Sequence, residues 1–285
     1  MKNLFVSYLY RLRHDLAFKI TLIIGAGLSV FLTLIYILLS VLIKTNMIDA
    51  QSMLVSSLSP SSNFGLAVPV NLITFTVLEF NQGSIRNKII AGHSKARIYS
   101  SLILNGLVFT FSLMIVYALV CTGLGAFSGW ALSLVKEIEQ PAGSLYPNEY
   151  VWKMVLMAAF CYLSIVCFTI FFSSLFRNIG PSIPVVIVVL VFASTLAPII
   201  VLVGSDNEAL LWVFRIIDPL FGLSAGETEI VGQVMVPTEE GMVIQAITEP
   251  VVKNETLISC ICSNLVYAAG FYFGGLLIFK KRDVK

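Results

Sequence analysis

Charged side chains are scarce in this sequence. Asp, Glu, Lys and Arg make up 12% of the 285 residues, 58% of the residues are hydrophobic, and the mean hydropathy is +0.92. A water-soluble domain usually has roughly a quarter of its residues charged, so this composition excludes one. The net charge of +2 is too small to indicate that the chain binds nucleic acid. We therefore expect a lipid bilayer as the environment of the chain.

Motifs of the common enzyme and metal sites are also missing. There is no GxxxxGK(S/T) phosphate loop, so we do not expect this chain itself to bind and hydrolyse ATP in the P-loop manner. Neither HExxH nor GxSxG occurs, and His14 and His93, the two histidines, form no Cys/His ligand cluster. The five cysteines lie in or beside apolar blocks, and their odd number argues against a disulfide framework. We expect no catalytic residue, cofactor site or metal site.

Long apolar blocks predict the fold class: all-α integral membrane, with residues 1–285 as a single transmembrane domain. A helix needs roughly 20 residues to cross ~30 Å of hydrocarbon. Six blocks reach or approach that length, at about residues 20–43, 64–79, 98–124, 153–176, 181–204 and 257–279. The first block is too long for a signal-peptide core and ends without a small-residue cleavage pattern, so we interpret it as a retained span.

The distribution of Lys and Arg predicts the orientation. An even number of spans places both termini on one side, and the tails and loops of that side hold 13 of the 18 basic residues. Basic residues concentrate on the cytoplasmic side of membrane proteins. The N and C termini are therefore predicted to be cytoplasmic. The opposite side holds Lys44, Lys136, Lys153, Arg215 and Lys253.

The middles of the predicted spans contain no Asp, Glu, Lys, Arg or His. Ion-coupled transporters keep such groups in the membrane in spite of their cost. The chain thus has the outline of a transporter without an internal energy source, and we expect a partner to supply the energy. Asn71, Asn105 and Asn264 are the strongest polar residues within the spans, and each could form interhelical hydrogen bonds or line a substrate pathway.

Residues 1–19 are predicted to form an amphipathic helix on the inner membrane surface. Apolar residues recur at helical spacing with cations beside them, namely Phe5, Leu9, Leu12 and Leu16 with Arg11, Arg13 and Lys19. The alternative is a cytoplasmic helix that packs on another protein.

The cytoplasmic loop at residues 80–97 is predicted to hold a short helix. Gly83 can break the second span, Ser84 can cap a new helix, and Gly92 suits the left-handed position that closes it. Ser94 can then cap the third span. The result is a structured basic protrusion where a plain connection would need only a few polar residues.

Two sides of this short helix are distinguished by their residues. Ile85 and Ile89 lie four residues apart on one side, whereas Arg86 and Lys88 are predicted to be exposed. The link between the fourth and fifth spans is very tight and places Arg177 at the same cytoplasmic face.

The segment 205–256 is the longest connection, and its nine acidic and two basic residues are predicted to be extracellular. Its apolar stretch ALLWVFRIIDPLFGL is too short to span the bilayer, so we predict helical outer segments between the fifth and sixth spans. The segment either covers the ends of these spans as a lid or meets a cationic cargo at the outer end of a pathway. In the second case the cargo would be attracted by Glu227, Glu229, Glu239 and Glu240.

The short second span, the loop EFNQGSIRNKIIAGHSKARIYSS and the long third span together resemble the permease subunits of export-type ABC transporters, the ABC-2 family, particularly those of Gram-positive bacteria. The resemblance covers nearly the whole chain. It implies that Ser84–Ala91 is a coupling helix that docks in a cleft of a separate ATPase subunit, with a second contact at Arg177–Gly180. It also implies a bacterial plasma-membrane location, with ATP and magnesium bound by the ATPase subunit.

The resemblance further implies that two permease subunits, either two copies or this chain and a homologous permease, pair around a central path. Small residues are expected at close helix contacts: Gly106, Gly123, Gly274 and Gly275. The residues expected to couple to the ATPase are Ser84, Ile85, Arg86, Asn87, Lys88, Ile89, His93, Arg177 and Asn178. Pathway candidates are Asn71, Asn105, Asn264 and the four glutamates named above.

The resemblance implies that the chain moves an amphipathic peptide, lipid or drug outward across the membrane. One alternative is a membrane subunit that confers immunity or relays a signal without bulk transport, through the same coupling helix. Another is the binding component of an ATPase-energised vitamin importer, but the uncharged span middles and the acidic outer segment do not favour a ligand pocket within one chain.

Overall fold

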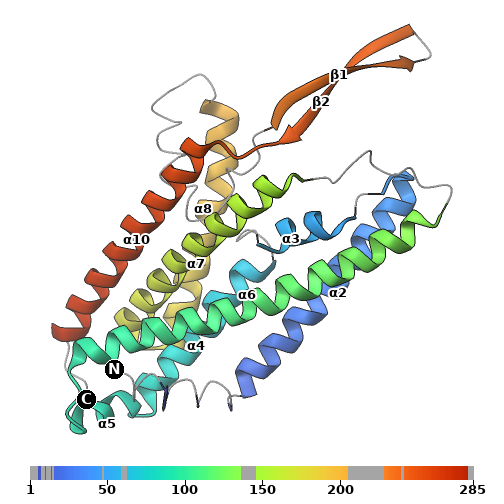
Figure 1. Cartoon of the computed structure of the whole chain (residues 1–285). Coiled ribbons are helices and arrows are strands. Elements are labelled where there is room, and N and C mark those ends of the chain that lie inside the picture. Colours follow the sequence, from blue (N-terminus) through green and yellow to red (C-terminus); the bar gives the residue numbers. More distant parts are fainter. Residues whose placement is uncertain are drawn as a thin grey trace.

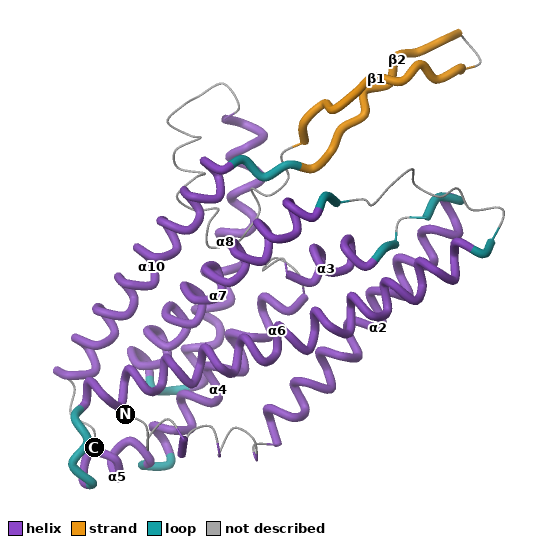
Figure 2. The backbone as a smooth tube through the Cα atoms, in the orientation of Figure 1, coloured by secondary structure: helices purple, strands orange, loops and turns teal. Residues whose placement is uncertain are grey.

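A computed structural model of the chain describes residues 6–7, 10, 14, 16–46, 48–58, 63–135, 146–204, 228–238 and 241–281. For residues 63–66, 193–204 and both strands it describes the backbone alone. Most of the predicted amphipathic helix at residues 1–19 lies outside the described residues. The described elements are α2 (Leu16–Ile43), α3 (Ala50–Leu58), α4 (Asn63–Asn81), α5 (Ser84–Ile90), α6 (Lys95–Ser133), α7 (Asn148–Phe176), α8 (Ile179–Gly204), β1 (Thr228–Thr238), β2 (Gly241–Pro250) and α10 (Asn254–Lys281) (Figures 1 and 2).

Four of these helices are long and apolar enough to cross a membrane: Phe18–Ile43, Lys95–Ser133, Asn148–Phe176 and Asn254–Lys281. They are compatible with a multi-pass membrane protein and coincide with the first, third, fourth and sixth predicted spans. The second and fifth predicted spans coincide with shorter apolar helices, described over Ala67–Asn81 and Ile179–Phe192.

α7 lies at the centre of the helical bundle. In its most apolar stretch 61% of residues are buried, against 17% in α2 and in α10. Helices α4, α6, α8 and α10 all pack on α7 (Figure 1). The core between them is formed by Leu72, Leu102, Leu113, Tyr162 and Ile165, each at most 2% exposed. Large apolar side chains on α2 and α10 instead remain on the outer surface, which is compatible with contact with lipid.

α6 is longer than a membrane crossing requires. Its 39 residues extend it nine positions past the predicted end at residue 124, and at 1.5 Å per residue it is ~58 Å long. A hydrocarbon core of ~30 Å leaves part of such a helix outside or demands a strong tilt. Phe127 and Trp130 are 66% and 60% exposed near its C-terminal end. Aromatic rings of this kind concentrate at membrane–water interfaces.

The sequence did not predict α3, the short helix between α2 and α4. Asp49 precedes α3, and its carboxylate accepts a hydrogen bond from the Ser52 amide at 2.6 Å, which satisfies a free donor of the first turn. The chain before and within α3 lies directly on two α6 glycines one turn apart. A Cβ at Gly129 would lie 2.5 Å from the Ile48 carbonyl oxygen, and a Cβ at Gly125 would lie 2.6 Å from Met53 Cγ. These glycines form the surface that holds α3.

The outer segment contains an antiparallel hairpin, so the prediction of helices there is wrong for residues 228–238 and 241–250. β1 pairs with β2 from Thr228↔Pro250 to Thr238↔Gly241, with an irregularity between Ile230 and Gly232. The stretches IVGQVMV and MVIQAIT are rich in Val and Ile, whose branched side chains favour a pleated backbone. The hairpin projects from the helices (Figure 2). The apolar stretch at residues 209–223 lies outside the described residues.

Candidate functional site

α5 lies between two glycines with left-handed backbone angles. Gly83 has a φ of 67° and Gly92 a φ of 85°, a region that glycine enters without the steric cost of a Cβ. The predictions that Gly83 breaks the preceding helix and Gly92 closes α5 are confirmed. The predicted cap is displaced by one residue, because Ser84 is the first helical residue and Gly83 occupies the N-cap position. Glycine has no side chain to cap the first turn, and its left-handed backbone turns the chain into α5.

One side of α5 is buried within this chain. Ile85 is 0% exposed, and Ile89 is partly buried against the main core cluster. On the other side Arg86 and Asn87 are exposed, and Ile90 is 74% exposed. An isolated seven-residue helix is unstable in water, so these buried isoleucines hold α5 against the bundle.

The burial of Ile85 corrects its predicted place in a docking surface. A side chain with no exposed area contacts only its own chain. Ile85 therefore stabilises the packing of α5 on the bundle and is not available to contact a partner. Ile90 was missed. The signal was present in the sequence, because Ile90 lies one helical turn after Arg86, opposite the Ile85 and Ile89 side. The exposed face of α5 is therefore Arg86, Asn87 and Ile90.

Lys88 was predicted to be exposed, but it is bound to α4. Its ammonium lies 2.8 Å from the Glu79 Oε2 atom, with side-chain exposures of 16% for Lys88 and 0% for Glu79. Burying a carboxylate without a partner is costly, so the lysine compensates much of the desolvation of Glu79. The ion pair fixes α5 to the last turns of α4.

Arg177 reaches the same end of α4 from the turn between α7 and α8. It ends α7 with a left-handed φ of 52°, and its guanidinium carbon lies 5.4 Å from the centre of the Phe80 ring. That distance suits a cation–π contact. Asn178 is exposed, and its side-chain oxygen accepts a hydrogen bond from the Gly180 amide at 3.3 Å. The predicted first and second coupling segments thus meet at adjacent residues of α4, Glu79 and Phe80.

A shallow pocket of about 430 Å³ lies along α5. It contains the predicted residue His93 together with residues of the first and last turns of α5. Its wall also includes Ser7, which therefore lies next to α5. The lining residues are Ser7, Gln82, Ser84, Asn87, Lys88, Ala91 and His93.

The first turns of α6 are fixed against the end of α10. Ser94 accepts a hydrogen bond from the Arg97 amide at 3.4 Å, which confirms it as the cap of α6. The Lys95 ammonium donates to the Lys280 carbonyl oxygen at 3.0 Å. Further in, Gly275 lets the buried Tyr99 ring lie against α10, because a Cβ there would overlap the Tyr99 hydroxyl. α4, α5, α6 and α10 therefore meet at one end of the bundle.

The four glycines predicted at close helix contacts differ in their surroundings. Gly106 lies against Ile170 and Leu72 side chains of this chain, and Gly275 against Tyr99, whereas Gly274 makes an ordinary contact with Phe171. A Cβ at Gly123 would meet nothing within 4 Å. Gly106 and Gly275 therefore serve contacts within one chain.

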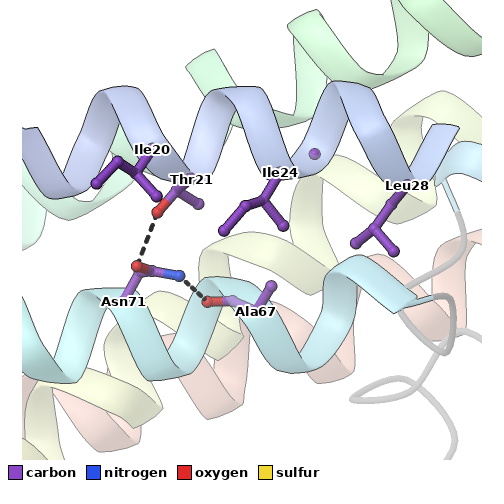
Figure 3. Close-up of a pocket in the computed structure, with 7 residues that line it drawn as sticks. Ile20, Thr21, Ile24, Leu28, Ala67 and Asn71 are labelled. Carbon is purple, nitrogen blue, oxygen red and sulfur yellow. Dashed lines mark hydrogen bonds between the residues drawn. The ribbon is translucent and has the colours of Figure 1, made fainter. Parts of the chain in front are cut away.

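Asn71 joins α2 to α4 (Figure 3). Its Oδ1 accepts a hydrogen bond from the Thr21 hydroxyl at 2.8 Å, and its Nδ2 donates to the Ala67 carbonyl at 2.8 Å. The pair borders a pocket of about 250 Å³ whose other walls are the apolar Ile20, Ile24 and Leu28 with Gly25. Asn71 thus forms an interhelical hydrogen bond, as the first of the two alternatives for this residue predicted.

The other two asparagines are fully buried but differ in their partners. Asn264 Oδ1 accepts from the Ser164 hydroxyl at 2.6 Å, and its Nδ2 donates to the Cys260 carbonyl at 3.0 Å. Asn105 has 0% exposure, and neither of its amide atoms has a hydrogen-bond partner among the described residues. An unsatisfied buried amide is costly, so Asn105 is the exception among the three.

The glutamates predicted at the outer end of a pathway cannot be placed around a site. Glu227, Glu239 and Glu240 lie outside the described residues, and for Glu229 the structure gives the β1 backbone position alone. Within the described part of the chain, no three His, Cys, Asp or Glu side chains lie close enough to hold a metal ion.

Comparisons with known proteins identify no relative. No family model, no curated protein and no solved structure matches the chain. The geometry of α5 and of the helix ends around it therefore carries the functional argument by itself.

Proposed function

We propose that this chain is the membrane-embedded permease subunit of an ABC exporter and that a separate ATPase subunit binds its exposed α5 face. The observation that carries the proposal is the form of α5 itself. It is a short helix between two left-handed glycines, held by a buried isoleucine and an ion pair, with Arg86, Asn87 and Ile90 directed outward. A helix that is fixed to the bundle on one side and exposed on the other can transmit a conformational change of a bound protein to the bundle.

Six spans with both termini in the cytoplasm form part of this proposal. In this proposal the two shorter apolar helices cross the membrane together with the four long ones, which gives six crossings. Basic residues gather at the α5 end of the bundle, where Arg86, Lys95, Arg177 and Lys280 lie, and this bias supports a cytoplasmic location for that end. The opposite end, with α3 and the hairpin, is then extracellular.

Two permease subunits would enclose the transport path. The span middles carry no charged side chain, and most polar atoms of Asn71 and Asn264 are already paired within the chain. One chain alone therefore offers little polar lining. The apolar surfaces of α2 and α10, whose outer faces remain exposed, are available for lipid or for the second subunit. The proposed cargo is an amphipathic peptide, lipid or drug.

Copurification with the ATPase tests the proposal. In the tagged full-length chain coexpressed with its ATPase, Ile90→Asp places a carboxylate at the centre of the proposed contact and should reduce ATPase recovery at least about tenfold, since buried contact residues contribute ~2 kcal/mol or more. Ile90→Val is the matched control and should retain the ATPase.

Membrane insertion and thermal stability of Ile90→Asp should match those of the wild type, because Ile90 is exposed in the isolated chain. Undiminished ATPase recovery with Ile90→Asp would reject α5 as the docking element. Failure of the wild-type chain to retain any ATPase would reject the permease function itself.

A further inference from the structure

We infer that Glu79 and Phe80, consecutive residues near the end of α4, form a junction that joins α5 and the α7–α8 turn into one mechanical unit. The inference rests on the proposed function for its consequence, which is that the two ATPase contacts move together. Glu79 is then a positioning residue: it would act through Lys88 and would not itself touch the ATPase.

The first half of the junction is the buried ion pair. Glu79 is completely buried, and Lys88 reaches it across the Gly83 turn at 2.8 Å. α5 has seven residues, too few to keep a helix without support from its surroundings. The orientation of α5 therefore depends on two contacts, the burial of Ile85 in the bundle and the Glu79–Lys88 ion pair. Without the carboxylate, Lys88 loses the charge that holds it against α4.

The second half of the junction is the Phe80 ring. It lies under the Arg177 guanidinium at 5.4 Å and contacts the Phe279 ring of α10 at 5.9 Å in an edge-on arrangement. Arg177 adopts the left-handed conformation that reverses the chain between α7 and α8. The ring thus ties that turn to α4 and to the buried end of α10, where Phe279 is 1% exposed.

Because Glu79 and Phe80 are neighbours in one helix, α5 and the turn cannot shift independently while both contacts hold. Below the junction, α4 packs on α8 through a separate cluster of Ile73, Val77, Val186 and Leu190. A displacement of α5 would therefore move α4 and α8 together. Packed elements with two discrete arrangements carry coupling of this kind between distant sites.

Replacing Glu79 by Gln tests the junction by removing the charge and keeping the shape of the side chain. In the chain–ATPase complex in lipid nanodiscs, Glu79→Gln should lower stimulation of ATP hydrolysis by the membrane subunit about tenfold while ATPase recovery stays close to wild type. Glu149→Gln is the matched control. It breaks a Lys153–Glu149 pair of the same 2.8 Å length, but at the opposite end of α7 and with Glu149 78% exposed. This control should leave stimulation unchanged.

The charge-swapped chain Glu79→Lys with Lys88→Glu supplies the rescue. It should recover at least about half of the wild-type stimulation, since a Coulomb attraction has the same sign in either direction. Unchanged stimulation in Glu79→Gln would overturn the inference, as would equal losses in Glu79→Gln and Glu149→Gln.

A measurement on the chain without the ATPase separates this inference from the proposed function. Amide hydrogen exchange in nanodiscs should accelerate in both α5 and residues 177–180 when Phe80→Ala is introduced, and in α5 when Glu79→Gln is introduced. Unaltered exchange in α5 of Glu79→Gln would overturn the junction even in a functional transporter. Accelerated exchange in a chain that binds no ATPase would reject only the proposed function.

Discussion

Single residues in the middle of the bundle show how polar groups are accommodated among apolar helices. Asn71 and Asn264 both bond across helix pairs, whereas both amide atoms of Asn105 lack a partner among the described residues. The sequence predicted that the three asparagines are notable but could not rank them. Their difference depends on which side chains of other helices face them, and spacing along one helix does not encode that.

Leucine substitutions should separate Asn264 from Asn105. Asn264→Leu removes the bonds to Ser164 and Cys260 and should destabilise the chain by about 1 kcal/mol, the usual value of an interhelical hydrogen bond in a membrane protein. Asn105→Leu replaces an unsatisfied amide by an apolar side chain of the same branching and should be neutral or stabilising. Thermal unfolding in one detergent measures both. Lower stability of Asn105→Leu than of Asn264→Leu would show that Asn105 has a partner.

At the scale of elements, the sequence predicted helices that are marked by local chemistry. Gly83, Gly92 and Ser94 mark α5 and the start of α6, because backbone freedom and capping act within a few residues. α3 was not predicted. Its sequence AQSMLVSSL is short and only moderately apolar, and its support comes from Gly125 and Gly129, more than 60 residues later.

The hairpin was missed for a related reason. The apolar stretch at residues 209–223 drew the interpretation of the whole outer segment toward interfacial helices. The Val- and Ile-rich stretches after it carry a strand signal, but short apolar runs of this kind leave helix and strand open until a pairing partner is known. The partner is the next stretch of the same segment, β2 for β1.

The contact of α3 with α6 predicts a specific effect of added methyl groups. Gly129→Ala places a Cβ against the Ile48 carbonyl and should displace α3, at a cost of about 1–3 kcal/mol for overpacking. Met53 is 2% exposed, so a thiol at Met53→Cys should react with an impermeant maleimide at least about tenfold faster in the Gly129→Ala background. Gly123→Ala is the control, because a Cβ at Gly123 meets nothing within 4 Å. Equal labelling rates in both backgrounds would show that α6 does not hold α3.

At the scale of the whole molecule, the two ends of the bundle differ in construction. At one end, α4, α5, α6, the α7–α8 turn and α10 are linked by ionic, cation–π and aromatic contacts. At the other end, α3 lies on glycines of α6. The Gln51 side chain of α3 also donates a hydrogen bond at 2.5 Å to the side-chain oxygen of Asn148, the first residue of α7. In the proposed transporter the first end receives the motion of the ATPase, and the second must open for the cargo to leave.

ATP hydrolysis by a complex whose outer end can be locked tests this transmission most directly. Gln51→Cys and Asn148→Cys are introduced with Cys262→Ser, which removes the exposed native thiol of the described residues, and are joined by a short cleavable bifunctional reagent in nanodiscs containing the ATPase. The locked complex is predicted to hydrolyse ATP about tenfold more slowly than the same complex after cleavage of the link, because the two ends are coupled. Equal rates before and after cleavage, with crosslinking verified, would contradict the proposal that this chain transmits ATPase motion across the membrane.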